Sequence, residues 1–505
     1  MLSFRYRIAA AAALLASTAT QAEWRQAKGR HFVVYADATE DQIRESATRL
    51  EQLDALMRLI SATPKELDEG ANVVTVYTVR NEDAIRKLMG RGGQNVAGFY
   101  LPRVSGSVAY TPAATSADDF SPQLVLFHEY GHHFLLGNYA APYPAWFSEG
   151  YAEYMATTKF DATDVRFGVP AQHRVYGLAY AMPVKRLFDG RDTIRGPQEI
   201  DAMYGRGWLL THMIVSDPAM AGRFNAYLDK LSAGVPSVEA ATQAFGKLSD
   251  FNRTVDAYLS RNKFVVKQMA RSRLPIAPIA IRTLTAGEAA MIGFRMRSDR
   301  GVDEKQAKAL LAQAAPVAAA HPNDAVAQGW LAEIAYDAKQ DDLAEAAADR
   351  AIAADPKSAQ ALLYKARVHL RRAIVAKAEP DAAAWKEARS WIVRANKVDT
   401  NDADALMLYY ESFAMAGAPP TRSAILGLKR ATQLVPQDGS LRWRAARQFL
   451  LDGDVDEAKM LLRPLAFDPH AAPDNPAAKL VALLDGGAKG PDAIATLEAQ
   501  AKAAK

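Results

Sequence analysis

Two histidines and a glutamate within five residues are the side chains of this sequence best suited to catalysis. His128, Glu129 and His132 belong to a His-Glu-x-x-His pentad. On a helix, His128 and His132 project from one face a turn apart, and this spacing suits two nitrogen ligands of one zinc ion. Glu129 stands beside the first histidine, where its carboxylate can take a proton from a water molecule that zinc activates.

The residues around the pentad predict the helix that must position it. Ser121 is a favourable N-cap, Pro122 suits the first helical turn, and Gly137 belongs to a typical stop signal. On this helix His133 points about 100° away from His132. We therefore expect His133 to take part in packing or to lie at the surface.

A second helix is expected over residues 145–154, after prolines that interrupt the chain. A catalytic zinc ion needs a third protein ligand and an open fourth position. Glu149 is well placed to supply this ligand, because sixteen residues separate it from His132. Glu153 follows one turn later on the same face and could orient a ligand imidazole.

The pentad, followed by Trp-Phe-x-Glu-Gly-x-Ala-x-Tyr, resembles the gluzincin metallopeptidases, which include thermolysin and the aminopeptidase-N-like enzymes. The resemblance covers roughly residues 30–260, with strong motifs in residues 128–153. The Pro-x-Trp segment before the glutamate is most similar to the peptidase MA-like proteins, which often join a gluzincin domain to helical repeats. The resemblance implies one zinc ion per chain, held by His128, His132 and Glu149.

The same resemblance implies roles for further residues. Glu129 would be the general base, and Glu153 matches the acid that supports a ligand in thermolysin. Gluzincins also carry an edge strand that pairs with extended substrate, and Val104–Tyr110 is the candidate; an ordinary strand is the alternative. Aminopeptidase-N-like enzymes use a downstream tyrosine as a donor to the oxyanion. Tyr204 is the candidate for this role, and a packed tyrosine is the alternative.

Two other histidines, His173 and His212, are alternative candidates for the oxyanion donor. A Gly-x-Met-Glu-Asn stretch, with which aminopeptidase-N-like enzymes grip a free amine, does not occur in the sequence. Endopeptidase action on proteins or peptides is therefore the preferred activity.

Bulk properties narrow the remaining function classes. A chain of 505 residues exceeds the usual size of one hydrophobic core, so several domains are expected. The net charge is only +4, which gives no basis for nucleic-acid binding. The sequence contains no cysteine, which excludes disulfides, thiolate zinc ligands and a cysteine nucleophile.

Residues 1–22 have the layout of a secretory signal peptide. Arg5 and Arg7 precede a short apolar core, and small residues at Thr20 and Ala22 suit cleavage before Glu23. The alanine-rich style is typical of bacteria, so we expect export to the periplasm or outside the cell. An uncleaved anchor is the alternative, whereas no later segment is long and apolar enough to hold the chain in a membrane.

Residues 23–264 are expected to form the gluzincin-like metallopeptidase domain. Strands alternate with helices here, which indicates a small mixed sheet beside the metal helix. The strands are expected at residues 31–36, 72–79, 98–101 and 107–110, and the helices at residues 39–60 and 82–89. Residues 159–200 look irregular, and a further helix should begin near Asp201. Residues 265–302 read as a connector with a short hairpin.

Residues 303–505 are alanine-rich and repeat, as expected for an all-α solenoid. Residues 323–356 show the tetratricopeptide pattern, whose period of 34 residues also separates Pro322 from Pro356. The alanines recur after a gap of 44 residues, which implies an insertion of ten residues near residues 377–384. The sequence thus resembles an array of four to five tetratricopeptide units with a binding groove, and a generic helical solenoid is the alternative.

The whole chain is therefore expected to be α+β, with a metallopeptidase domain followed by helical repeats. The preferred function is an exported zinc metallopeptidase that takes a protein or peptide substrate and recruits a substrate or protein partner on its repeats. The main alternative is a non-catalytic repeat scaffold with a peptidase-like metal domain. A zinc hydrolase acting on a non-peptide amide or ester is a third reading.

Overall fold

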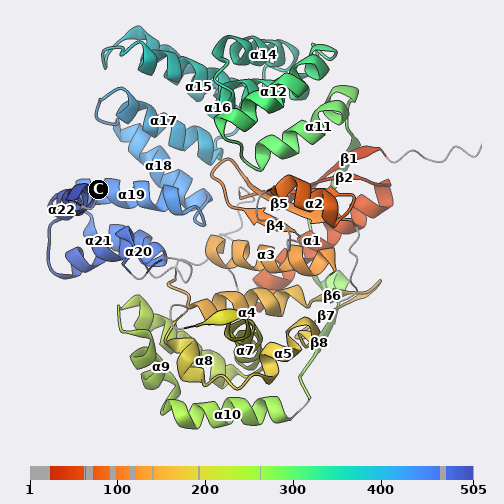
Figure 1. Ribbon diagram of the computed structural model, residues 1–505, viewed down its shortest axis with the longest axis vertical. Helices are drawn as coiled ribbons and strands as arrows, with labels where there is room; N and C mark the ends of the chain where they lie inside the picture. Colours follow the sequence, from red (N-terminus) through yellow and green to blue (C-terminus); the bar gives the residue numbers. More distant parts are fainter. Residues whose placement is uncertain are drawn as a thin grey trace, which may run out of the picture.

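A computed structural model describes the chain at residues 23–61, 63, 72–90, 98–113, 121–138, 141–190, 194–261, 263–466, 472 and 474–503. The expected signal peptide, residues 1–22, lies outside these described residues. The chain is α+β, with a small sheet near its N-terminus and a long region of paired helices toward its C-terminus (Figure 1). No helix in the described parts of the chain combines the length and the apolar character that crossing a membrane requires.

A six-stranded mixed sheet organises the N-terminal part, in the order β4-β5-β3-β2-β1-β9. Its strands are β1 (Trp24–Lys28), β2 (Phe32–Asp37), β3 (Val74–Val79), β4 (Phe99–Leu101), β5 (Ser107–Pro112) and β9 (Ala280–Thr283). The central strands β2, β3 and β5 run parallel, and β1, β4 and β9 are antiparallel to their neighbours. The four strands expected from the sequence are confirmed, whereas β1 was not expected and β9 was expected only within a short hairpin.

Both faces of the main sheet are buried, because side chains that alternate along its strands pack in two different hydrophobic clusters. Val34 and Val76 pack in one hydrophobic cluster with α1 (Glu40–Ile60) and α3 (Pro122–Asn138). Tyr77 and Tyr110 pack on the opposite face, against residues of α2 (Glu82–Met89) and α11 (Ala286–Asp299). Successive side chains of a strand point to opposite faces, so a single strand serves both clusters. The sheet is consequently covered on both sides (Figure 1).

Helices below the sheet complete the part that contains the candidate site. They are α4 (Ala145–Ala156), α5 (Val175–Ala179), α6 (Val184–Phe188), α7 (Gly196–Ser216), α8 (Pro218–Ser232), α9 (Ser237–Phe245) and α10 (Leu248–Ser260). A small second sheet, β6-β7-β8, joins β6 (Lys159–Phe160), β7 (Asp164–Phe167) and β8 (Lys267–Ala270). Residues 159–200 therefore contain short strands and helices, where the sequence suggested irregular structure.

Residues 265–302 do not form the expected hairpin. The strand β8 pairs with β7 in the small sheet, whereas β9 pairs with β1 in the main sheet. Helix α11 then covers the main sheet, with Met291 and Ile292 fully enclosed. The hairpin prediction was wrong because each strand finds its partner far away in the sequence, and local residue patterns do not encode such pairing.

The predicted substrate-binding edge strand, Val104–Tyr110, is also corrected. Within the described sheet, β5 lies between β4 and β3, so its backbone groups on both sides are already paired. The short strand β4 forms the edge instead. A strand with two neighbours has no free ladder of N–H and C=O groups to offer an extended peptide.

The C-terminal region consists of antiparallel helix pairs. They are α12 (Glu304–Ala319), α13 (Ala325–Asp337), α14 (Asp341–Ala354), α15 (Ala359–Val375), α16 (Ala383–Val398), α17 (Ala403–Met415), α18 (Arg422–Leu434), α19 (Gly439–Leu451), α20 (Val455–Ala466), α21 (Pro476–Asp485) and α22 (Gly490–Ala503). Helices α13, α15, α17 and α19 begin 34, 44 and 36 residues apart. The long interval reflects a longer α15 and a longer turn before α16.

The helix pairs approach closely through small buried residues, as the repeat pattern predicted. Ala344, Ala351, Ala388, Ala395 and Ala431 are completely buried. An alanine at such a position brings two helix axes nearer than a larger side chain would allow. The helical repeat architecture is thereby confirmed for the described residues.

The repeats also return to the sheet. Gln437, in the turn between α18 and α19, exchanges two side-chain hydrogen bonds with Asn72, of 2.7 and 2.6 Å. Val104, before β5, packs against the hydrophobic cluster that begins at Ala403. The repeats near the α18–α19 turn are therefore attached to the part that carries the candidate site (Figure 1).

A buried hydrogen bond between the sheet and α11 provides a test of this arrangement. The Tyr77 hydroxyl donates to Asp299 at 2.6 Å, and both residues are buried. We expect Tyr77→Phe to lower the apparent free energy of unfolding by about 1–3 kcal/mol in denaturant titration, because a buried carboxylate loses a donor. Tyr35→Phe is the matched control, since Tyr35 accepts from the partly exposed Gln26. Equal losses in both variants would contradict the interpretation.

Candidate metal centre

Helix α3 carries the pentad and begins where the sequence predicts. The Ser121 hydroxyl accepts a hydrogen bond from the backbone N–H of Leu124 at 3.2 Å and caps the helix, which ends at Asn138. His128 and His132 leave the same face, with their ring centres 4.9 Å apart. Their side chains are 14% and 18% exposed, so both remain accessible to an ion.

Helix α4 lies against α3 because two small residues meet at the crossing. A Cβ atom on Gly131, inside the pentad, would stand 2.9 Å from Cα of Ala152. Real Cβ atoms do not approach a backbone this closely, so only glycine permits the contact. The approach brings Glu149, at the start of α4, beneath the two histidines.

Helix α7 packs equally closely on the other side of α4. A Cβ atom on Gly150 would lie 2.3 Å from the backbone of Gly207, and one on Gly207 would lie 2.3 Å from the Trp146 carbonyl oxygen. This contact fixes α4 between α3 and α7. The carboxylates of α4 are thereby held in the interior, with the Glu149 and Glu153 side chains only 3% and 1% exposed.

The structure brings the three predicted ligands together. His128 Nε2 lies 3.3 Å from His132 Nε2 and 3.5 Å from Glu149 Oε2, and His132 Nε2 lies 3.4 Å from the same oxygen. Ligand atoms about 2.0–2.1 Å from a tetrahedral zinc ion are about 3.3 Å from one another. The three residues therefore fit a zinc ion, and they form a potential metal-binding group among the described residues.

The other ring nitrogens have partners of their own. His132 Nδ1 lies 3.1 Å from the Ser148 hydroxyl, and His128 Nδ1 lies 3.5 Å from Glu153. Such contacts hold an imidazole in the orientation and tautomer that present Nε2 to a metal. Glu153 thus lies where a carboxylate that supports His128 was predicted, and Ser148 makes the corresponding contact with His132.

Glu153 is itself held by two side chains from the segment before α5. His173 Nε2 lies 2.6 Å from Glu153 Oε2, and Arg174 donates to Oε1 through Nε and Nη2 at 2.9 and 2.7 Å. Arg174 also donates to Asp201 on α7 at 3.1 Å, and its guanidinium lies 4.5 Å from the centre of the Tyr204 ring. Arg174 therefore connects Glu153 with α7.

These contacts keep the carboxylates charged. Burial alone would raise the pKa of Glu149, but hydrogen bonds from His128 and His132 hold it well below its usual range. Burial also opposes ionisation of Glu153, yet His173, His128 and Arg174 lower its pKa to about 2. The pKa of His128 is raised, because Glu149 and the neighbouring carboxylates outweigh its burial. Anionic carboxylate oxygens beside imidazole nitrogens are suited to bind a dication.

The other residues that the sequence singled out differ in whether they lie near this triad. Tyr204, on α7, stacks on His128 with ring centres 6.2 Å apart. Burial raises the pKa of Tyr100 on the edge strand, and the nearby charge of Glu129 adds to this effect. His133 is buried, as one of the two expected outcomes, and lies 2.6 Å from the Tyr100 hydroxyl. His212 contacts Tyr258 and the Val265 carbonyl instead of the triad.

Sequence reasoning did not assign three residues to their places in this network. Ser148 directly precedes the predicted ligand Glu149, so its position in the sequence could have indicated a contact with the metal site. His173 was considered only as an oxyanion donor, and Arg174 was not considered. Both follow Glu153 by about twenty residues in a segment of short elements, where local patterns do not predict long-range contacts.

No protein-family model matches this sequence, and no curated protein matches it. Among solved structures, the chain is similar to one titled "Crystal structure of MamA". The two share 17% sequence identity over 37% of this chain and 96% of that chain, with a TM-score of 0.26. A TM-score this low does not establish a common fold, so the candidate site rests on its own geometry.

The supporting role of Glu153 can be measured through metal affinity. We expect Glu153→Gln to weaken zinc binding about 10- to 100-fold in a chelator competition, because His128 loses the anion that orients it. Glu199→Gln is the control, since Glu199 on α7 pairs with Arg186 at 2.8 Å instead of with a residue of the triad. Unchanged affinity in Glu153→Gln, with a normal melting temperature, would contradict the assigned role.

Proposed function

We propose that this protein is a zinc-dependent metallopeptidase, acting as an endopeptidase on proteins or peptides. The observation that carries the proposal is the triad of His128, His132 and Glu149, with atoms spaced for one zinc ion, on a helix that also carries Glu129 directly after His128. A purely structural zinc site has no use for such a neighbouring base. The signal-peptide pattern of residues 1–22 supports an exported enzyme.

Three protein ligands suit a catalytic site rather than a closed structural one. A zinc ion held by them would keep a fourth position open and would lower the pKa of water there toward neutrality. The partial exposure of both histidines leaves that side of the triad accessible. Glu149, which is almost fully buried, approaches the two histidines from helix α4 and stays anionic.

Glu129 is proposed as the proton carrier of the reaction. Its carboxylate takes the proton of the attacking water as the new C–O bond forms at the scissile carbonyl. It then returns the proton to the nitrogen of the leaving amine as the C–N bond breaks. Glu129 follows His128 directly on α3, so the helix that presents the ligand also presents the base.

Tyr204 is proposed as the donor that stabilises the oxyanion. Its ring stacks on the ligand His128 and lies under the guanidinium of Arg174. A phenol held at this position could donate a hydrogen bond to the charge that develops on the carbonyl oxygen. The two ring contacts would keep the phenol in place before the reaction begins.

Zinc content and hydrolysis separate this function from a non-catalytic repeat scaffold. We expect purified residues 23–505 to contain a single zinc ion, Glu149→Ala to lose it, and Glu129→Gln to retain it. Hydrolysis of a mixed protein digest should fall about 10²- to 10⁴-fold in Glu129→Gln, because the proton carrier is gone. A zinc-free wild-type chain after reconstitution, or near-normal hydrolysis by Glu129→Gln, would reject the proposal.

Tyr204→Phe tests the oxyanion donor separately. We expect kcat to fall about 10²- to 10³-fold, as when one oxyanion donor is removed, with KM and zinc content little changed. His212→Gln is the control, because the contacts of His212 lie at Tyr258 and Val265. A normal kcat in Tyr204→Phe would show that this tyrosine only packs.

A further inference from the structure

An open groove of about 540 Å³ lies between α16 and α17, in the middle of the repeat region. We call this feature the α16 groove. Its lining includes Lys386, Arg389, Val393, Arg394, Lys397, Tyr409 and Phe413. The groove is distinct from the metal centre in residues and in helices.

The four cations of the α16 groove lie along one side of α16. Lys386 and Arg389 are three residues apart, as are Arg394 and Lys397, and Lys386 and Arg394 are eight apart, so the four side chains share one broad side of the helix. Lys386 and Lys397 mark the ends, and at 1.5 Å per residue they are about 16 Å apart along the helix axis. This length matches about five residues of an extended peptide.

The cations of the α16 groove differ from those elsewhere in the repeats. Arg367, Arg371 and Arg372 each lie within 2.8 Å of an aspartate or glutamate oxygen. Over the described residues, no ion pair joins any of the four groove cations to a carboxylate. A set of like charges without counterions raises the local potential and attracts anions.

Arg389 is held in place by neutral groups. Its Nε donates to the Ser412 hydroxyl at 2.9 Å, its Nη2 donates to the Ser412 carbonyl at 3.0 Å, and its guanidinium lies 4.0 Å from the Phe413 ring centre. Burial lowers the pKa of Arg389. A fixed guanidinium retains donors for a carboxylate and loses little freedom on binding.

The α16 groove also contains an exposed apolar side chain, so it favours a bound anion that carries apolar groups as well. Val393 lines it and is 40% exposed. The aromatic rings are already engaged, since Phe413 lies under Arg389 and packs edge-to-face with Tyr409 at 5.4 Å. A nucleic acid needs free rings for its bases or a wider basic surface. An extended peptide with acidic and apolar side chains meets both features of the groove.

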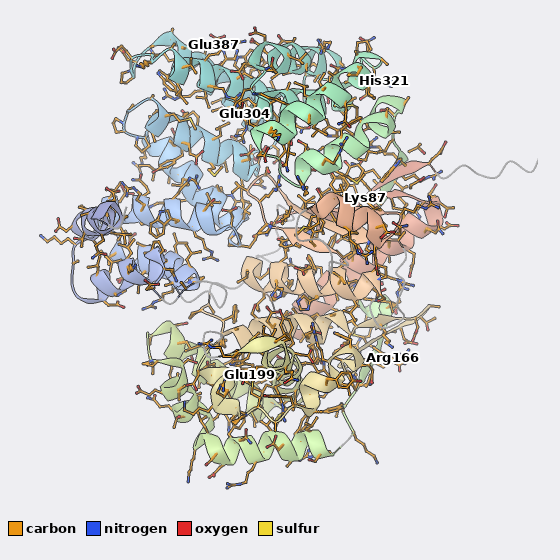
Figure 2. All side chains as sticks on the ribbon, in the orientation of Figure 1. Lys87, Arg166, Glu199, Glu304, His321 and Glu387 are labelled. Carbon is orange, nitrogen blue, oxygen red and sulfur yellow. The ribbon has the colours of Figure 1, made fainter. Side chains whose placement is uncertain are left out.

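The position of α16 leaves the metal centre free. Figure 2 shows Glu387, the neighbour of Lys386, toward the end of the molecule opposite to Glu199 on α7. Helix α7 also carries Tyr204, next to the metal triad. A protein bound in the α16 groove would therefore not occupy the triad.

We propose that the α16 groove docks an acidic, partly apolar peptide segment of a partner protein. The four cations bind its carboxylates, and Val393 contacts its apolar side chains. Binding of a peptide in the α16 groove does not require peptidase activity, so the two proposals are tested independently.

The test uses residues 23–505 with Glu129→Gln, so that a peptide is not cut. The probe is a fluorescein-labelled peptide of about ten alternating glutamates and leucines, followed by anisotropy. We expect saturable binding that weakens with added salt, since exposed charges are screened. Lys386→Glu with Lys397→Glu should weaken binding about tenfold or more, because two attractions become repulsions.

The matched control is Lys305→Glu with Lys357→Glu, which changes the net charge equally at exposed sites outside the groove. The control should bind as the unchanged chain does. Absence of binding, equal binding by both charge-reversed variants, or equal binding of a glutamine-for-glutamate peptide would overturn the proposal. Tighter binding of anionic phospholipid vesicles or single-stranded DNA, lost with Lys386→Glu and Lys397→Glu, would overturn the peptide assignment.

Discussion

The candidate metal centre depends on the close contact of three helices. His128 and His132 come from α3, whereas Glu149 comes from α4, so the triad exists only if these helices nearly touch. Gly131 permits this contact on one side of α4, and the pair Gly150 and Gly207 permits the contact with α7 on the other. Any side chain at these points would separate the backbones and move the ligands apart.

The close packing of these helices buries two carboxylates of α4, those of Glu149 and Glu153, one helical turn apart. Burial disfavours the charged form of each. Neighbouring side chains offset this effect and lower the pKa of both carboxylates. His128 and His132 do so for Glu149, and His173 and Arg174 do so for Glu153. Arg174 also contacts Asp201 and the Tyr204 ring, so the group that keeps Glu153 charged also positions α7.

The repeats and the sheet form one structure rather than two loosely joined parts. Helix α11 covers the sheet face opposite to α3, through Tyr77, Tyr110 and their partners. Gln437, in the turn between α18 and α19, forms hydrogen bonds with Asn72 near the sheet. The α16 groove lies between these two attachments along the chain, where the basic side chains of α16 form no ion pair with a carboxylate of the described residues.

Local sequence determined the parts of this protein that short-range physics governs. The cap at Ser121, the spacing of His128 and His132, and the buried alanines of the repeats each depend on residues within a few turns of one helix. Tertiary structure alone decided that β4 is the edge strand, that β9 joins β1, and that Arg174 supports Glu153. These contacts join residues distant in sequence, and their partners are selected by packing and charge in the folded chain.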